Sequence, residues 1–194
     1  MILAYAAIAL IALALLFKRD LGAIGKLPYK GNWKLIAIIM GLFVLQWITV
    51  IIAEERTFLQ MMLLIASHLT LILLFLINRH IAGAKLFALG IFLNTLVMVV
   101  NGGWMPVAPE MAHFVHPDRP AEVYSHPAKS KNIILPRSET NLWILSDNIP
   151  VTLPWRKNAV SIGDVLMIVA IGLFLFQPAV SKQQSRKPLK TEIT

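Results

Sequence analysis

Residues 35–77 decide the fold class, and they read LIAIIMGLFVLQWITVIIAEERTFLQMMLLIASHLTLILLFLI. Two apolar blocks, residues 35–53 and 57–77, are separated only by the charged tripeptide at residues 54–56. Each block is close to the roughly 20 residues that a helix needs to span the hydrocarbon core of a bilayer. Because so short a link joins them, the two blocks are expected to form antiparallel, neighbouring membrane helices.

Three further apolar blocks, residues 1–17, 81–100 and 158–177, extend the same pattern along the chain. The first block is followed at once by Lys18 and Arg19. A cleaved signal peptide carries its positive charge before the apolar core, so this block is interpreted as a retained first helix. The chain is therefore expected to cross the membrane five times.

The segment between the fourth and fifth blocks, residues 101–157, differs from the rest of the chain. It holds most of the eleven prolines and many polar residues, which is typical of a loop or a small cap. A polar, basic tail follows at residues 181–194. The predicted fold is all-α: a polytopic membrane helix bundle in one domain, residues 1–180, with a long extracytoplasmic loop or cap between the fourth and fifth transmembrane helices.

Composition supports this class and excludes others. The chain is 57% hydrophobic and 14% charged, against roughly 45–50% and about 25% in soluble domains. Its net charge is +8, but the basic residues lie between and after the apolar blocks, so the lipid bilayer is the expected partner and nucleic acid is not. There is no cysteine, which excludes disulfides, thiolate metal sites and cysteine nucleophiles.

Basic residues in the short loops predict the orientation, because cytoplasmic loops carry an excess of lysine and arginine. Eleven of them lie in residues 18–34, in the loop around Arg79 and Lys85, and in the tail, whereas the short loop on the other side holds only Arg56. The amino terminus and the 101–157 segment are therefore expected outside, and the carboxyl terminus in the cytoplasm. The expected location is the plasma membrane of a bacterial cell.

Polar residues inside spans are costly in lipid and therefore informative. In this topology Gln46, Gln60, Asn94 and Asn101 all lie in the outer half of the membrane. They are interpreted either as the lining of a polar cavity under the outer segment or as interhelical hydrogen bonds that hold the bundle together. The sequence leaves both interpretations open.

Asp164 is the acidic residue of the fifth block, and it also has two interpretations. If the helix begins near Asn158, Asp164 lies about 9 Å inside it and is a candidate for a buried site. The sequence from Ser161 to Asp164 also fits a capping box at the start of a helix. The two roles are compatible, because a carboxylate at a helix start can also face a cavity.

The fourth block ends in paired glycines, Gly102 and Gly103, followed by Pro106. Glycines suit a left-handed helix stop, and the proline prevents the helix from resuming. The functional alternative is that the glycines let backbone amides approach a ligand. His113 and His116 are three residues apart, but their proline-rich surroundings favour a solvated loop, so no metal or other cofactor is expected.

Three stretches form a recognisable set: NGGWMPV at residues 101–107, NLWILSDNIP at residues 141–150 and SIGDV at residues 161–165. The set resembles a bacterial family of small polytopic membrane proteins of unknown function, with GGxMPV and SIGDV motifs. The resemblance covers nearly the whole chain and supplies no activity. It implies that the three stretches lie near one another, at or outside the outer face.

Three functions are compatible with these features. The first is a binding or accessory module, with an outer-leaflet polar cavity for a lipid, a small apolar ligand or a partner membrane protein. The second is an enzyme acting on a lipid-like substrate, with Asp147 and Asp164 as acid–base groups, and the third is a small transporter or channel. The candidate binding residues are Gln46, Asn94, Asn101, Gly102, Gly103, Met105, Asp147 and Asp164.

Overall fold

A computed structural model describes residues 2–52, 58–127 and 130–177. The tail at residues 181–194 and the short link at residues 54–56, both used in the topology prediction, lie outside the described residues.

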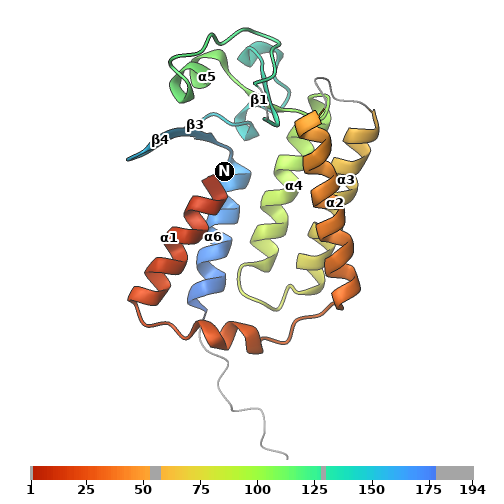
Figure 1. The fold of residues 1–194 in the computed structure, drawn as a ribbon, viewed down its shortest axis with the longest axis vertical. Helices are drawn as coiled ribbons and strands as arrows, with labels where there is room; N and C mark the ends of the chain where they lie inside the picture. The colour runs from red at the N-terminus through yellow and green to blue at the C-terminus, as the bar shows by residue number, and fades with distance from the viewer. Residues whose placement is uncertain (1, 53–57, 128–129, 178–194) are drawn as a thin grey trace, which may run out of the picture.

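The described residues form five long helices, and Figure 1 shows them as a row beneath a smaller region. Their bounds are α1 (Ile2–Leu16), α2 (Trp33–Ile52), α3 (Phe58–Ile77), α4 (Ala84–Val100) and α6 (Ile162–Phe176). The most extensive helix contacts run in the order α2–α3–α4–α6–α1. Each of these five long helices falls on one of the apolar blocks, because these segments contain no proline and few competing polar groups.

The region above the row, residues 101–161, is called the cap. Its short helical elements are α5 (Pro109–Val115), η2 (Arg137–Glu139) and η3 (Trp143–Leu145). Its strands are β1 (Met105–Val107), β2 (Asn132–Ile134), β3 (Ile149–Leu153) and β4 (Arg156–Val160). β1 pairs with β2 in parallel, and β3 pairs with β4 as an antiparallel hairpin. The all-α prediction is therefore wrong for the cap, although the described chain is mostly helical.

The fifth apolar block begins its helix later than predicted. Residues 158–160 belong to strand β4, and α6 starts at Ile162 after the N-cap residue Ser161. The reason is that Asn158 pairs with Val151 across the hairpin, a long-range contact that overrides the local apolar pattern.

The contact between α4 and α6 is unusually close. A Cβ atom added at Gly90 would lie 2.6 Å from the carbonyl oxygen of Gly163, and one added at Gly163 would lie 2.6 Å from that of Gly90. Real Cβ atoms essentially never approach backbone so closely. The two glycines therefore let these helix backbones meet, as small residues do in membrane bundles.

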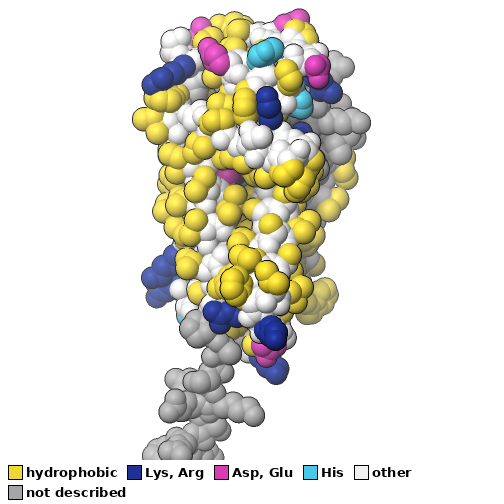
Figure 2. Space-filling view, turned by 90° about the vertical axis from the view of Figure 1, so that its left-hand side faces the viewer, with side chains coloured by type: hydrophobic (Ala, Val, Ile, Leu, Met, Phe, Trp, Pro, Cys, Tyr) yellow, Lys and Arg dark blue, Asp and Glu magenta, His cyan; other side chains and the backbone are white. Residues whose placement is uncertain are grey.

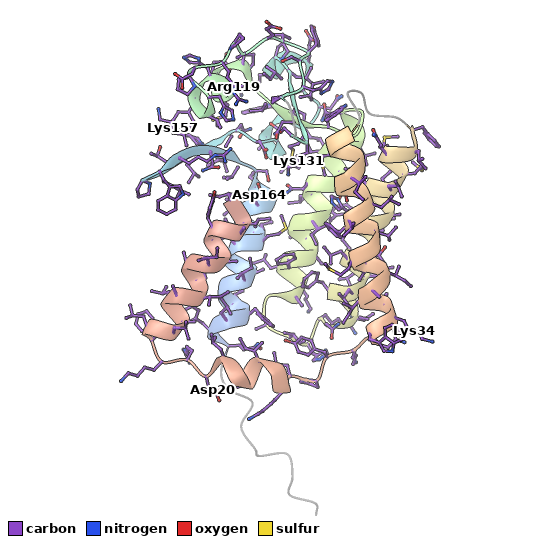
Figure 3. All side chains as sticks on the ribbon, viewed as in Figure 1. Asp20, Lys34, Arg119, Lys131, Lys157 and Asp164 are labelled. Carbon is purple, nitrogen blue, oxygen red and sulfur yellow. The ribbon has the colours of Figure 1, made fainter. Side chains whose placement is uncertain are left out.

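Opposite the cap, the row is closed by the connection between α1 and α2. This connection contains a 3₁₀ helix, η1 (Leu21–Lys26), and it contacts the turn between α3 and α4. The Asn78 side chain accepts a hydrogen bond from the Lys30 amide at 2.7 Å and donates one to the Lys30 carbonyl at 2.8 Å. Asp20 and Lys34 lie at this end of the molecule in Figure 3.

The outer surface of the row is apolar. Among the most exposed large side chains are Ile8 (65%), Leu59 (66%) and Leu73 (60%). Figure 2 shows hydrophobic side chains over the middle of the molecule and Lys and Arg side chains near the end away from the cap. Within the described residues one helix, Phe58–Ile77, is long and apolar enough to cross a membrane by length and composition alone.

Candidate functional site at the junction of helices and cap

The first part of the site is the start of α6. The Asp164 amide donates a hydrogen bond to Ser161 Oγ at 3.0 Å, and the Ser161 amide reaches Asp164 Oδ2 at 3.5 Å. These reciprocal contacts are the capping box that the sequence predicted. The interpretation in which the helix begins near Asn158 is wrong, because that residue lies in β4.

Asn94 of α4 joins the capping box to the neighbouring helix. Its Nδ2 donates to Asp164 Oδ1 at 2.9 Å, and its Oδ1 accepts from Ser161 Oγ at 2.8 Å. All three side chains are buried. Each Asp164 oxygen therefore has a hydrogen-bond partner, and this carboxylate fixes the start of α6 against α4.

Asp147, from the loop before β3, is the second carboxylate at the junction. Only 5% of it is exposed, and its amide donates to the Pro106 carbonyl at 3.2 Å. Its Oδ2 accepts from Asn132 Nδ2 at 2.9 Å. Its Oδ1 is buried and has no hydrogen-bond partner among the described residues. An unpaired buried carboxylate oxygen is costly, which makes this atom a candidate point of ligand contact.

Burial raises the pKa of Asp147 from its ordinary value of 3.8 to about 6, and the nearby Asp164 carboxylate also raises it. Lys131 and the Asn132 hydrogen bond oppose this rise in pKa. The carboxyl is consequently balanced between its protonated and ionised forms close to neutral pH. Groups poised in this way are frequent at functional sites.

Lys131, just before β2, is the positive group of the site. Surrounding protein opposes the charge on its ammonium, but the carboxylates of Asp147 and Asp164 outweigh that effect and raise its pKa. Lys131 as a whole nevertheless remains exposed to solvent. Figure 3 shows Lys131 and Asp164 at the boundary between the cap and the helices. A charged side chain that is surrounded by protein yet accessible is suited to contacting a ligand.

The three stretches that carry the family resemblance meet around this site. The Asn101 side chain donates to the Asn141 carbonyl at 2.9 Å and accepts from the Asn141 amide at 3.0 Å. Pro106 accepts from the Asp147 amide, and the charges of Asp147 and Asp164 act on one another. Segments far apart in the chain thus converge between the cap and α6, as the resemblance implied.

The glycines and Met105 have structural positions near the site. Gly102 and Gly103 have φ angles of 70° and 87°, and the Gly103 amide donates to the Met98 carbonyl at 2.7 Å. This arrangement is a left-handed helix stop. Met105 is fully buried and packs with Val97 and Met98, so it fixes the cap to the top of α4.

Gln46 makes a hydrogen bond between two helices. Its Oε1 accepts from Ser67 Oγ at 2.7 Å, which joins α2 to α3. His68 Nδ1 and Thr95 Oγ1 lie 2.7 Å apart and join α3 to α4. These pairs match the interpretation of polar residues as interhelical hydrogen bonds. Asn94 fits both interpretations, because it joins two helices and also borders the charged site.

Lys131 and Asn132 are site residues that sequence reasoning missed. Both sit in a polar loop segment with no motif of its own, and they reach the site because β2 pairs in parallel with β1. The pairing of Met105 with Asn132 brings the lysine beside the Asp147 region. Among the residues the structure describes, no group of three or more His, Asp or Glu side chains is arranged to hold a metal ion.

A row of apolar helices under a cap, with two aspartates and a lysine where they meet, defines a mostly helical protein with a charged site at that junction. The chain belongs to the family described as "Family of unknown function (DUF5317)", whose model matches residues 26–177. It is similar to an "Uncharacterized protein" of Thermotoga maritima, with 36% identity over 126 residues that cover 63% of this chain and 68% of the relative. No solved structure matches the chain.

Proposed function

We propose that this chain is a multi-pass membrane protein that binds the polar head group of a membrane amphiphile under its cap. The helices α1, α2, α3, α4 and α6 cross the bilayer, and the cap lies on the outer side. The outward-facing apolar side chains of the row support this location, since water would disfavour so large an apolar surface. Only 17% of the most apolar window of α3 is buried, which is unlike the core helix of a soluble protein.

The depth of the site follows from helix geometry. Asn94 contacts the first turn of α6, and residues 95–100 of α4 continue beyond it. Six residues rise about 9 Å, so α6 begins below the end of α4 and the cap occupies the space above it. Non-helical backbone at membrane depth needs cover by protein, and the cap supplies it.

The single observation that carries the binding proposal is the buried Asp147 Oδ1 atom, which has no hydrogen-bond partner within residues 2–52, 58–127 and 130–177. A ligand hydroxyl or ammonium can donate a hydrogen bond to this atom, and a ligand phosphate or carbonyl can accept one from Lys131. A head group with both features satisfies the site, while its tail lies along the apolar helices. Asp164 does not contact this ligand, because Asn94 and Ser161 occupy its oxygens.

The test is native mass spectrometry of the full chain purified in a mild detergent from its membrane. The wild type is expected to retain an amphiphile that Asp147→Asn and Lys131→Met lose. Asp118→Asn in the cap and Lys85→Met at the opposite end are matched controls that should retain it. Two results would contradict the binding proposal: equal retention of the amphiphile by all variants, or no retention even by the wild type.

One observation favours a second function, acid–base catalysis on a lipid-like substrate. A carboxyl with a pKa of about 6 can both accept and donate a proton near neutral pH. Incubation of the protein with its retained amphiphile separates the two functions. Catalysis predicts a product of altered mass that appears with the wild type and not with Asp147→Asn, whereas binding predicts an unchanged ligand.

A further inference from the structure

A recess lies within the cap itself, away from the charged site at the junction. It has a volume of about 220 Å³ and is formed where the end of α5, the following loop and β2 come together. Its polar lining groups are His116, Arg119 and Ser125, and its walls include Ala112 and Ile134. No carboxylate is among the described residues that line it. Figure 3 places Arg119 in the upper cap, above Lys131 and Asp164.

The electrostatics of this recess are positive. Burial lowers the pKa of His116, and the guanidinium groups of Arg119 and Arg156 lower it further. Both guanidinium groups therefore lie close enough to His116 to act on it, Arg119 as a lining residue of the recess and Arg156 from β4. Both arginines are exposed, so their attraction for an anion is expected to weaken as salt is added.

We propose that the cap recess binds a small oxyanion, a phosphate or carboxylate group, through Arg119 with support from Arg156 and His116. Guanidinium groups bind planar or tetrahedral oxyanions by paired, charge-assisted hydrogen bonds. Ser125 adds a hydroxyl at the wall. The volume is below the roughly 300 Å³ at which drug-sized ligand pockets begin, so the ligand is limited to a small molecule or a single anionic group. This site is independent of the head-group site at the junction.

The two possible sources of the oxyanion are a soluble molecule and a lipid head group. The full chain in detergent is titrated with inorganic phosphate at constant ionic strength, and binding is followed by calorimetry. A second titration uses nanodiscs with and without phosphatidic acid. Arg119→Gln is the test variant, and Arg137→Gln is the control, because Arg137 is a cap arginine that stacks on Trp143 instead.

We expect Arg119→Gln to weaken phosphate binding about tenfold or more, and Arg137→Gln to leave it unchanged. Arg119 is exposed, so the variant should fold, and its melting temperature without phosphate provides the check. Dependence on Arg119 seen only with phosphatidic acid supports the oxyanion site and assigns its source to lipid. Absence of Arg119-dependent binding in both titrations, or an equal loss with Arg137→Gln, overturns the proposal.

Discussion

The helix row and the cap are built by different physical means. In the row, each helix satisfies the hydrogen bonds of its own backbone. Apolar side chains face outward, as with Leu73, which is 60% exposed. In the cap, the elements are three to seven residues long, and distant segments satisfy one another, as when the Leu135 amide bonds the Val107 carbonyl at 3.1 Å. The helix row is thus specified by local sequence, and the cap by long-range pairing.

The boundary between the two regions teaches most about function. Met105 of the cap packs against residues of α3 and α4, so the cap is in direct contact with the row. Charged groups are gathered at this junction, where Asp147, Lys131 and Asp164 interact. Burying charges is costly unless they are paired, so the gathering of these charged groups makes the junction, and not either region alone, the candidate site.

The largest expected effect comes from a substitution that forces apart α4 and α6, the two helices beneath the junction. Gly163→Val places a branched side chain against the Gly90 carbonyl and the Asn94 side chain. Overpacking costs typically about 1–3 kcal/mol and more where backbone must move, so little folded protein should be recovered. Yield and thermal unfolding in detergent are the measurements, and Gly41→Ala, which has open space, is the control. A fully stable Gly163→Val protein would show that α4 and α6 do not pack as described.

The second prediction concerns the pH dependence of Asp147. Its pKa in the folded protein, about 6, is above its ordinary value of 3.8, so the folded state binds the proton more tightly. Stability relative to Asp147→Asn should therefore fall as pH rises from about 4 to about 6 and stay level above that. The difference in pKa of about 2 corresponds to roughly 3 kcal/mol. If the free energies of unfolding of the two proteins change with pH in the same way across this range, the buried position of Asp147 is contradicted.

Smaller effects are expected at the capping box. Ser161→Ala removes the acceptor for the Asp164 amide and the donor to Asn94, and loss of a cap costs about 0.5–2 kcal/mol. Asp164→Asn keeps an acceptor for Asn94, so its loss should be near the dipole contribution of roughly 0.3–1 kcal/mol. Thermal unfolding ranks the two variants. Because both Asp164 oxygens already have protein partners, Asp164→Asn should also retain the amphiphile. Loss of the ligand from this variant would mean that the Asp164 carboxylate contacts the ligand directly.

The helices were predictable because each depends on a local run of apolar residues. Residues 57–77 were expected and Phe58–Ile77 is observed. The capping box was also predictable, since Ser161 and Asp164 are three residues apart. Asn158 was predicted to begin the helix because its strand, β4, continues directly into the apolar block. Its pairing with β3, which keeps it in a strand, is a long-range contact that the local sequence does not reveal.

The candidate site was predictable only in part. Asp147 and Asp164 were named from their motifs, and Asn94 from its cost within a span. Lys131 was not, because its partners lie 16 and 33 positions further along the chain, and the parallel pairing of β1 with β2 leaves no periodic signal in strands of three residues. Composition alone cannot reveal which loop lysine lies beside which carboxylate.

The most direct test of the proposed contrast, an apolar row in lipid and a cap in water, is cysteine labelling of intact cells. The chain has no natural cysteine, so a single one can be placed at Ser138 in the cap or at Gly25 in η1, where the added side chain has open space. An impermeant thiol reagent should label Ser138→Cys in intact cells and Gly25→Cys only after permeabilisation. Labelling of both in intact cells, or the reverse pattern, would contradict a membrane-spanning row with the cap outside.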